Sequence, residues 1–589
     1  MKSWLSGLRR AKPLRILAAG TWLVAALVLW HRLPYGVSHT DEAFYSAMPY
    51  SFLLGNKPYF TELAMHQNAA LLLVPFFRVY LAVVGSADGI IMFNRHLYFA
   101  YICICSILAY RLVSRISGSV FACFVAALII PFSYFALFAL SYNTCGAFGF
   151  FCGIVSTATA LLGPRPGRQL FGASLWFLSG IFAYPGYAPA LLLYVLIVVF
   201  WLYRRAPRED LKSGLLGLGA GLVAFLAVIV PLAVWLGKAG VDRLIGFSQS
   251  MGYVSMGFLA KLNPTGTVAW LWRWGVLEFA CAFVLLPVAC RLLQRAAWAL
   301  PLIALRAAWY LNLLSLRDTF GTGDVRAGFS RGVTVCLIAL PVLTPVCILL
   351  NRQWRYGRFI LTLVWLPAFV SMVCVVYSSA NGYVSMPLGS LGTTLAGVVS
   401  FHALLMHLAE RNPTQKRYFF QLTSACVVAP IIAMHFSNIY SGCYDIESAL
   451  ARHDTRVSAG PLKGALATRV EAARIEAIDR DLKSVQDQGA SLSVFDNFAT
   501  GYLSTRLQPR TFSQWIVWDI APAYAQLLTE QTFGAPDKLP DFVLELDVVD
   551  GARQFWEPYF KGKYSPVIRR PKLGYVIMKR NKPRRRHAK

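Results

Sequence analysis

Apolar runs of about twenty residues recur along this chain of 589 residues, and they limit its fold more than any other feature. A helix rises about 1.5 Å per residue, so a run of this length crosses a hydrocarbon core about 30 Å thick. The runs do not alternate between apolar and polar residues as barrel strands do, so we interpret them as helices. With 57% hydrophobic and 14% charged residues, the sequence indicates an α-helical polytopic membrane protein.

The runs predict about thirteen transmembrane helices, and the links between them predict their direction. The expected spans are residues 14–33, 94–113, 119–140, 145–162, 170–185, 187–203, 214–236, 269–293, 297–316, 332–350, 358–377, 389–408 and 418–436. Alternate links, such as "RLVSRISG" and "NRQWRYGR", carry most of the loop arginines. Because basic links stay in the cytoplasm, we expect a cytoplasmic N-terminus in a plasma membrane, specifically a bacterial inner membrane. An odd number of spans then places the C-terminal part outside.

Two runs leave alternatives open. Residues 69–84 are short and are interrupted by Pro75 and Arg78, so we expect a helix at the outer interface. If this run crossed the membrane, every later basic link would face outward. The run 297–316 contains Arg306 near its middle, and an amphipathic helix on the inner side is the alternative there.

The last 150 residues or so differ in character from the rest and predict a second domain. The stretch "LATRVEAARIEAIDRDLKSVQ" has helical spacing with mixed charge, and "SLSVF", "DFVLELDVV", "YSPVIR" and "GYVIMKR" are typical of strands. We therefore expect a transmembrane domain over residues 1–436. Residues 437–589 should form a small extracytoplasmic α/β domain that ends in a basic tail.

Charge and cysteine content exclude two other classes. The net charge of +28 would suggest a nucleic-acid partner in a soluble protein. Here the basic residues lie in short links and in the tail 579–589, which fits contact with membrane lipids and no nucleic acid. All twelve cysteines except Cys443 lie within or beside apolar runs without a CxxC pair, so they predict no disulfide framework or zinc site.

The first outer loop, residues 34–95, carries the features that point to chemistry. Asp41 and Glu42 follow the first span directly, and the loop is long for a connection without a folded domain. One interpretation is helix capping, because Ser38 followed three residues later by Asp41 fits a capping box. The other is a catalytic pair, favoured by the many polar and aromatic side chains in the same loop.

The sequence of this loop resembles the GT-C membrane glycosyltransferases. The resemblance lies in "DEAFYSAMPYSFLLGNKPYFTELAMH" and "GSADGIIMFNRHLYF", and the nearest groups are the protein O-mannosyltransferases and the lipid A aminoarabinose transferases. The positions that correspond to the family pattern are Asp41, Glu42, Ala43, Tyr45, Gly55, Pro58, Tyr59, Gly85 and Arg95. The specific similarity covers about residues 35–115.

The resemblance implies a membrane glycosyltransferase. Such an enzyme moves a hexosyl or pentosyl group from a polyprenyl-phosphate donor to an extracytoplasmic glycan, glycolipid or protein, with inversion. Asp41 is then the general base, and Glu42, the other acid of the pair, has a positioning role or makes a loop contact. The donor phosphate requires cations, for which the outward candidates are Arg95 first, then Lys57, Arg78, Arg243 and Lys261. A lipid-headgroup anchor is the alternative for Arg95.

The chain departs from the family pattern at two places. It has "MHQNAA" where many relatives have Lys-Pro-Pro, so His66 is either a substitute hydrogen-bond donor or structural. The second outer loop reads "SYNTC", in which Asn143 can orient a hydroxyl group but cannot act as a base. We therefore expect no required cofactor, with a divalent cation left open. Asp318 and Asp324 belong to a glycine-bearing loop that is either a lid or a solvated link.

Further substrate contacts follow from the same resemblance. In loop one, Tyr45 and Tyr59 are expected beside the substrate. In the C-terminal domain, "FATGYLSTRLQPRTF" resembles a strand-end loop of bacterial relatives. It offers Tyr502, Arg506 and Arg510 on the acceptor side.

Other functions remain alternatives. A lipid-linked glycan ligase or polymerase would use similar substrates on the same side of the membrane. A polytopic transporter would usually show internal repeats and broken helices, and neither is evident in the sequence. A noncatalytic receptor or assembly factor is a third class.

Overall fold

The computed structural model describes most of the chain. The residues outside the description are 1, 63–66, 134–136, 164–165, 206–207, 251–263, 274, 305, 307–332, 380–381, 412–416, 442–451, 496–497, 512–513, 515–528, 531, 536–537, 547–555 and 582–589.

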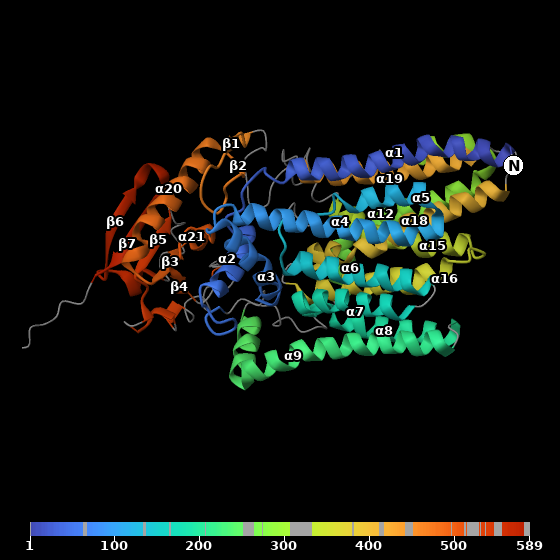
Figure 1. Cartoon of the computed structure of the whole chain (residues 1–589). Coiled ribbons are helices and arrows are strands. Elements are labelled where there is room, and N and C mark those ends of the chain that lie inside the picture. Colours follow the sequence, from blue (N-terminus) through green and yellow to red (C-terminus); the bar gives the residue numbers. More distant parts are fainter. Residues whose placement is uncertain are drawn as a thin grey trace, which may run out of the picture.

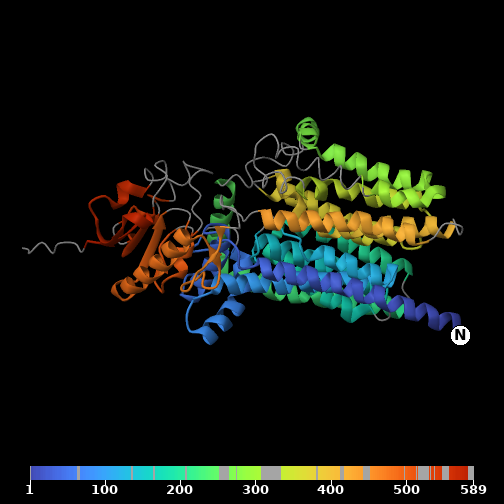
Figure 2. The same cartoon turned by 90° about the horizontal axis from the view of Figure 1, so that it is seen from above.

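The described residues form a long helical bundle with a smaller domain at one end (Figure 1 and Figure 2). The helices of the bundle are α1 (Lys2–Arg32), α4 (Ile90–Ser117), α5 (Ser119–Ile129), α6 (Tyr142–Leu161), α7 (Pro166–Ala183), α8 (Ala188–Arg205), α9 (Arg208–Ser250), α11 (Pro264–Arg273), α12 (Val276–Leu292), α15 (Leu343–Leu350), α16 (Gly357–Ile360), α17 (Leu366–Ser378), α18 (Leu391–Arg411) and α19 (Arg417–Ser441). Many apolar side chains on the outer helices are exposed, including Leu192, Leu196 and Val234. Such a surface fits a lipid environment.

Within the described ranges, nine helices are long and apolar enough to cross a membrane. A polytopic helical membrane protein is thus confirmed, whereas the count of thirteen spans stays a prediction. Three of the expected spans differ in detail. Helix α5 ends at Ile129, shortly before Pro131. Gly275, in a left-handed conformation, separates α11 from α12. In the segment 297–316, the 3-10 turn Gln294–Ala299 is followed by helical residues 300–304, and residues 307–316 lie outside the description.

Helix α3 (Gln67–Val84) corresponds to the run that we expected at the interface. By length and composition it could cross a membrane. It lies at the end of the bundle nearest the C-terminal domain and projects away from the bundle helices (Figure 2). The interfacial position of this helix stays a prediction.

The C-terminal domain contains a five-stranded mixed sheet in the order β4-β3-β5-β7-β6. Its strands are β3 (Ser491–Phe495), β4 (Gln508–Pro509), β5 (Phe542–Leu546), β6 (Tyr564–Arg570) and β7 (Tyr575–Arg580). Strand β3 runs parallel to β4 and β5, while β7 is antiparallel to β5 and β6. The four strands expected from the sequence correspond to β3, β5, β6 and β7, so the α/β class is confirmed.

Helix α20 (Arg469–Val485) packs against this sheet and forms from the predicted mixed-charge segment. Thr468 caps it, because its side chain accepts a hydrogen bond from the Glu471 N–H at 3.3 Å. The apolar face of α20, including Ile475, Ile478 and Leu482, is buried. A two-stranded ribbon of β1 (Thr455–Arg456) and β2 (Leu466–Ala467) precedes the helix and touches loop one.

Candidate active site

Helix α2 (Asp41–Leu53) begins with the two predicted acids. Thr40 is the N-cap residue, and its side chain makes no capping hydrogen bond to the helix, while Ser38 Oγ lies 3.3 Å from Thr40 Oγ1. The capping box that we considered for Ser38 and Asp41 is therefore wrong. Both carboxylates lie in the first turn, where they interact favourably with the helix dipole.

The two acids lie in different environments. Asp41 is partly exposed, whereas Glu42 is only 2% exposed. Neighbouring residues on a helix point in different directions, so the two side chains do not share one contact surface. This separation agrees with the different roles predicted for them.

Glu42 forms a forked ion pair with Arg95 of α4. Nε of Arg95 donates to Oε1 at 2.5 Å, and Nη2 donates to Oε2 at 2.6 Å. The same guanidinium donates to the carbonyl oxygens of Leu33 and Gly36 at 2.5 and 2.7 Å. Arg95 thus joins the end of the first span, helix α2 and helix α4 at one buried point.

This geometry changes the interpretation of Arg95. Its side chain is buried, and its remaining N–H points toward the Met92 sulfur at 3.9 Å. A guanidinium has five N–H groups, and the described contacts engage all of them. The arrangement does not fit the phosphate contact that we ranked first, because no donor remains for a phosphate. A positioning role, holding Glu42 and the start of α2, fits the contacts better.

The other side of α2 contacts the second outer loop. Asn94 donates to Ser46 Oγ at 3.2 Å, and its carbonyl oxygen accepts the N–H of Leu140 at 3.1 Å. The Tyr45 ring lies 5.9 Å from the ring of Tyr142, which neighbours Asn143 in the first turn of α6. Tyr45, one turn after Asp41 in α2, thus lies near the start of α6, which contains Asn143.

Gly55, Pro58 and Tyr59, which match the family pattern, lie in a turn that follows α2. Tyr59 has a φ of 64°, a conformation that a bulky residue adopts only when its surroundings hold it there. Its N–H donates to Gln67 Oε1 at 2.5 Å, and its hydroxyl donates to Asn68. Burial raises the pKa of the Tyr59 hydroxyl. Tyr59 therefore fixes the turn, and its ring stays within the protein.

Loop one also contacts the C-terminal domain through His39, a residue that no sequence pattern singled out. Nδ1 of His39 lies 3.1 Å from Thr500 Oγ1, and Nε2 lies 3.2 Å from Glu471 Oε1. The imidazole packs on the Phe498 ring at 4.6 Å, and the His39 carbonyl accepts the N–H of Ala499. His39 precedes Asp41 by two residues, so this contact orients the start of α2.

Further hydrogen bonds extend the same interface. Tyr50 donates to the Thr505 carbonyl at 3.1 Å, and Glu62 Oε2 accepts the N–H of Gln514 at 3.0 Å. Lys483 of α20 lies 2.9 Å from Asp88 Oδ1 in loop one. The C-terminal domain therefore packs against the loop that carries the candidate site.

The predicted acceptor-side residues divide into two groups. Tyr502 is 1% exposed, and its hydroxyl accepts the Val494 N–H at 3.0 Å, so it belongs to the domain core. Arg506 and Arg510 are exposed, and Arg510 Nε donates to the Lys538 carbonyl at 3.0 Å. Both arginines lie on the surface of the domain, in contrast to Tyr502.

The remaining candidate residues include exposed cations and residues outside the described ranges. Lys57 and Arg78 are exposed, and neither forms an ion pair with a residue in the described ranges. His66, Lys261, Asp318 and Asp324 lie outside the described residues, as does the side chain of Arg243. Within the described part of the chain, no group of three or more His, Cys, Asp or Glu side chains could hold a metal ion.

No family model matches the chain, and no curated protein matches it. Among solved structures, it is similar to the Archaeoglobus fulgidus oligosaccharyltransferase in the apo form, with 11% identity and a TM-score of 0.49 over 93% of this chain and 73% of that one. It is also similar to ArnT from Cupriavidus metallidurans bound to undecaprenyl phosphate, with 13% identity and a TM-score of 0.40 over 95% and 97%. Both are GT-C fold membrane glycosyltransferases. At these identities and TM-scores the likeness carries no inference about substrate or reaction.

Proposed function

We propose that this protein is a membrane glycosyltransferase that transfers a sugar from a polyprenyl-phosphate donor to an extracytoplasmic acceptor. The observation that carries the proposal is the different environment of the two acids of the "DEAFY" segment. Glu42 is buried and held by Arg95, while Asp41 is partly exposed at the start of α2. Asp41 is thus the carboxylate of the pair that can meet a substrate.

In the proposed reaction, the Asp41 carboxylate accepts the proton of the acceptor hydroxyl. The hydroxyl oxygen attacks the anomeric carbon from the face opposite the phosphate, and the new carbon–oxygen bond forms with inversion. The bond from the anomeric carbon to the phosphate oxygen breaks, and polyprenyl phosphate leaves. Proton transfer of this kind contributes roughly 10²- to 10⁴-fold to the rate.

Arg95 acts in this proposal as a positioning residue, because it fixes Glu42 and the residues that flank Asp41. The phosphate charge is then met by exposed cations. Lys57 lies on the turn that follows α2 and is the first candidate, with Arg78, Arg506 and Arg510 as further ones. Tyr45 and Asn143 line the α2 side, where Asn143 orients a hydroxyl group.

The proposal includes an orientation in the membrane. The basic links favour a cytoplasmic N-terminus in a bacterial inner membrane, with the site and residues 437–589 outside. A reporter that is active only in the cytoplasm, fused after Lys589, should give no signal. A strong signal would place the C-terminal domain in the cytoplasm and contradict this orientation.

The donor class is tested by identifying the lipid that remains with the purified protein. Mass spectrometry should detect a polyprenyl phosphate or its glycosylated form. The variant Lys57→Gln should retain several-fold less of it than wild type, and Lys572→Gln, an exposed lysine of the C-terminal domain, should retain as much as wild type. Added polyprenyl-phosphate sugar that neither binds nor reacts would contradict the proposal.

A further inference from the structure

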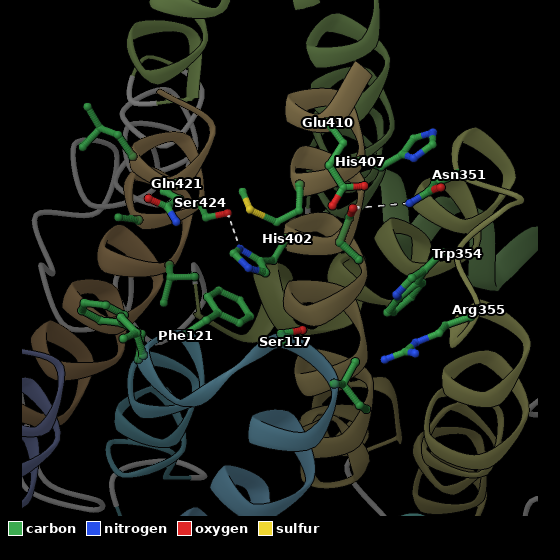
Figure 3. A pocket seen from close by; sticks show the side chains of 18 of the residues that line it. Ser117, Phe121, Asn351, Trp354, Arg355, His402, His407, Glu410, Gln421 and Ser424 are labelled. Atoms are coloured by element: carbon green, nitrogen blue, oxygen red, sulfur yellow. Dashed lines mark hydrogen bonds between the residues drawn. The ribbon is translucent and has the colours of Figure 1, made fainter. Parts of the chain in front are cut away.

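A cavity of about 930 Å³ lies in the bundle at the end far from the C-terminal domain. It is enclosed by the end of α4, by α5, by the turn after α15, and by α18 and α19 (Figure 3). Its size falls in the range typical of small-molecule sites. None of the proposed catalytic residues line it, so it is separate from the candidate active site.

The lining has an apolar part and a polar part. The apolar part is formed by Val120, Phe121, Phe124, Leu422 and Val428. These residues belong to α5 and α19, which are apolar helices of the membrane domain. A cavity with such a lining can accommodate an acyl chain.

The polar part contains one cation and one anion. Arg355 is exposed, lies over the Tyr356 ring at 4.5 Å and forms no ion pair with any residue in the described ranges. Glu410 stands near the end of α18. In Figure 3, Glu410 and Asn351 occupy the upper part of the cavity and Arg355 the lower part. The two charges are therefore separated across the cavity.

Asn351 supplies an independent observation. It is 3% exposed, and its amide nitrogen donates to the Ala403 carbonyl at 3.4 Å. Its Oδ1 atom is buried and has no hydrogen-bond partner among the described residues. An unsatisfied buried acceptor is unfavourable, and this one belongs to a residue that lines the cavity.

We propose that this cavity binds a zwitterionic phospholipid with a primary ammonium group, of the phosphatidylethanolamine kind. Its phosphate lies toward Arg355, and its ammonium donates to Glu410 and to Asn351 Oδ1. One acyl chain follows Phe121, Phe124 and Leu422. The headgroup complements both charges and supplies the donor that Asn351 lacks, whereas phosphatidylcholine has the same charges without an N–H donor.

The test uses the full-length protein in detergent with equal amounts of phosphatidylethanolamine, phosphatidylcholine and phosphatidylglycerol of matched acyl chains. Native mass spectrometry then measures which lipid remains bound. One or two charge-assisted hydrogen bonds should favour phosphatidylethanolamine over phosphatidylcholine roughly 3- to 10-fold. This comparison needs no variant. Equal retention of the two lipids, or stronger retention of phosphatidylglycerol, would overturn the proposal.

Two variants assign the preference to this cavity. Glu410→Gln should reduce the ratio of bound phosphatidylethanolamine to bound phosphatidylcholine toward one. Arg355→Gln should weaken the binding of both lipids several-fold. Arg204→Gln is the matched control, because Arg204 also lies over an aromatic ring, that of Phe200 at 5.0 Å, but outside the cavity. If Arg204→Gln reduced lipid retention as much as Arg355→Gln, the arginines would contact lipid in a general way, and the assignment to this cavity would be overturned.

Discussion

Arg95 holds Glu42 with both branches of its guanidinium, through Nε to Oε1 at 2.5 Å and Nη2 to Oε2 at 2.6 Å. The pair joins two helices that are distant in sequence, and its members are 3% and 2% exposed. Such a pair orients the segment that carries it, since charged groups leave water only with good geometry. The start of α2, with Asp41, is therefore positioned from inside the protein.

The first prediction concerns this pair. Arg95→Met should destabilise the protein by about 3–5 kcal/mol, because it leaves the Glu42 carboxylate buried without a partner. The double variant Glu42→Leu with Arg95→Met should lose less stability than the two single variants lose in total. Denaturant unfolding in detergent measures all three. If Arg95→Met kept wild-type stability and only weakened donor binding, the phosphate contact first expected for Arg95 would be correct instead.

The second prediction concerns pH and the contact between loop one and the C-terminal domain. Burial alone would raise the pKa of Glu471, but the hydrogen bond and charge of His39, with the charge of His453, lower it below its usual value of 4.5. The carboxylate therefore stabilises the fold fully above about pH 4.5, and this contribution is lost as the pH falls through the lower folded-state pKa.

Hydrogen exchange in α20, followed from pH 7 to pH 3, measures this effect. Wild type should lose protection at the acid end, and Glu471→Gln should show low protection with a weaker pH dependence. Glu476→Gln is the control, since Glu476 is a half-buried residue of the same helix whose carboxylate accepts a hydrogen bond from the Ser458 N–H. Identical profiles for wild type and Glu471→Gln would contradict the role of His39.

The third prediction tests helix packing in the bundle. A Cβ atom on Gly149 of α6 would lie 2.7 Å from Gly180 Cα of α7, so the two backbones meet at this position. Gly149→Ala should destabilise the protein by about 1–3 kcal/mol, as overpacking does. Gly172→Ala in α7 should be neutral or stabilising, because nothing lies within 4 Å of its Cβ position. Equal melting temperatures for the two variants would contradict this packing.

Local sequence patterns predicted much of the architecture. The apolar runs predicted the bundle helices because a lipid environment requires whole helical spans. The alternating stretches predicted β3, β5, β6 and β7, and the mixed-charge segment predicted α20, because period and propensity act over a few residues. Helix breaks were harder to predict. Gly275 divides an apolar run that hydropathy alone describes as continuous.

The contacts of the candidate site could not be predicted in the same way. Arg95 and Glu42 are 53 positions apart, and His39 and Glu471 are 432 apart. No spacing rule connects such residues, and a single sequence does not show which arginine is buried. The resemblance in loop one suggested the catalytic role of Asp41. The different environments of Asp41 and Glu42 became visible only through the burial of Glu42.

The most direct test of the account is the rate of sugar transfer by Asp41→Asn. Asn has nearly the same shape but cannot accept the proton, so transfer of labelled sugar from a polyprenyl-phosphate donor to membrane acceptors should fall by about 10²-fold or more. Thermal stability should stay close to wild type, because Asp41 is partly exposed and Thr40 is the N-cap. Asp88→Asn, the same change in the same loop at a residue paired with Lys483, should keep near-normal transfer. A folded Asp41→Asn protein that transfers sugar at the wild-type rate would contradict the catalytic role of Asp41.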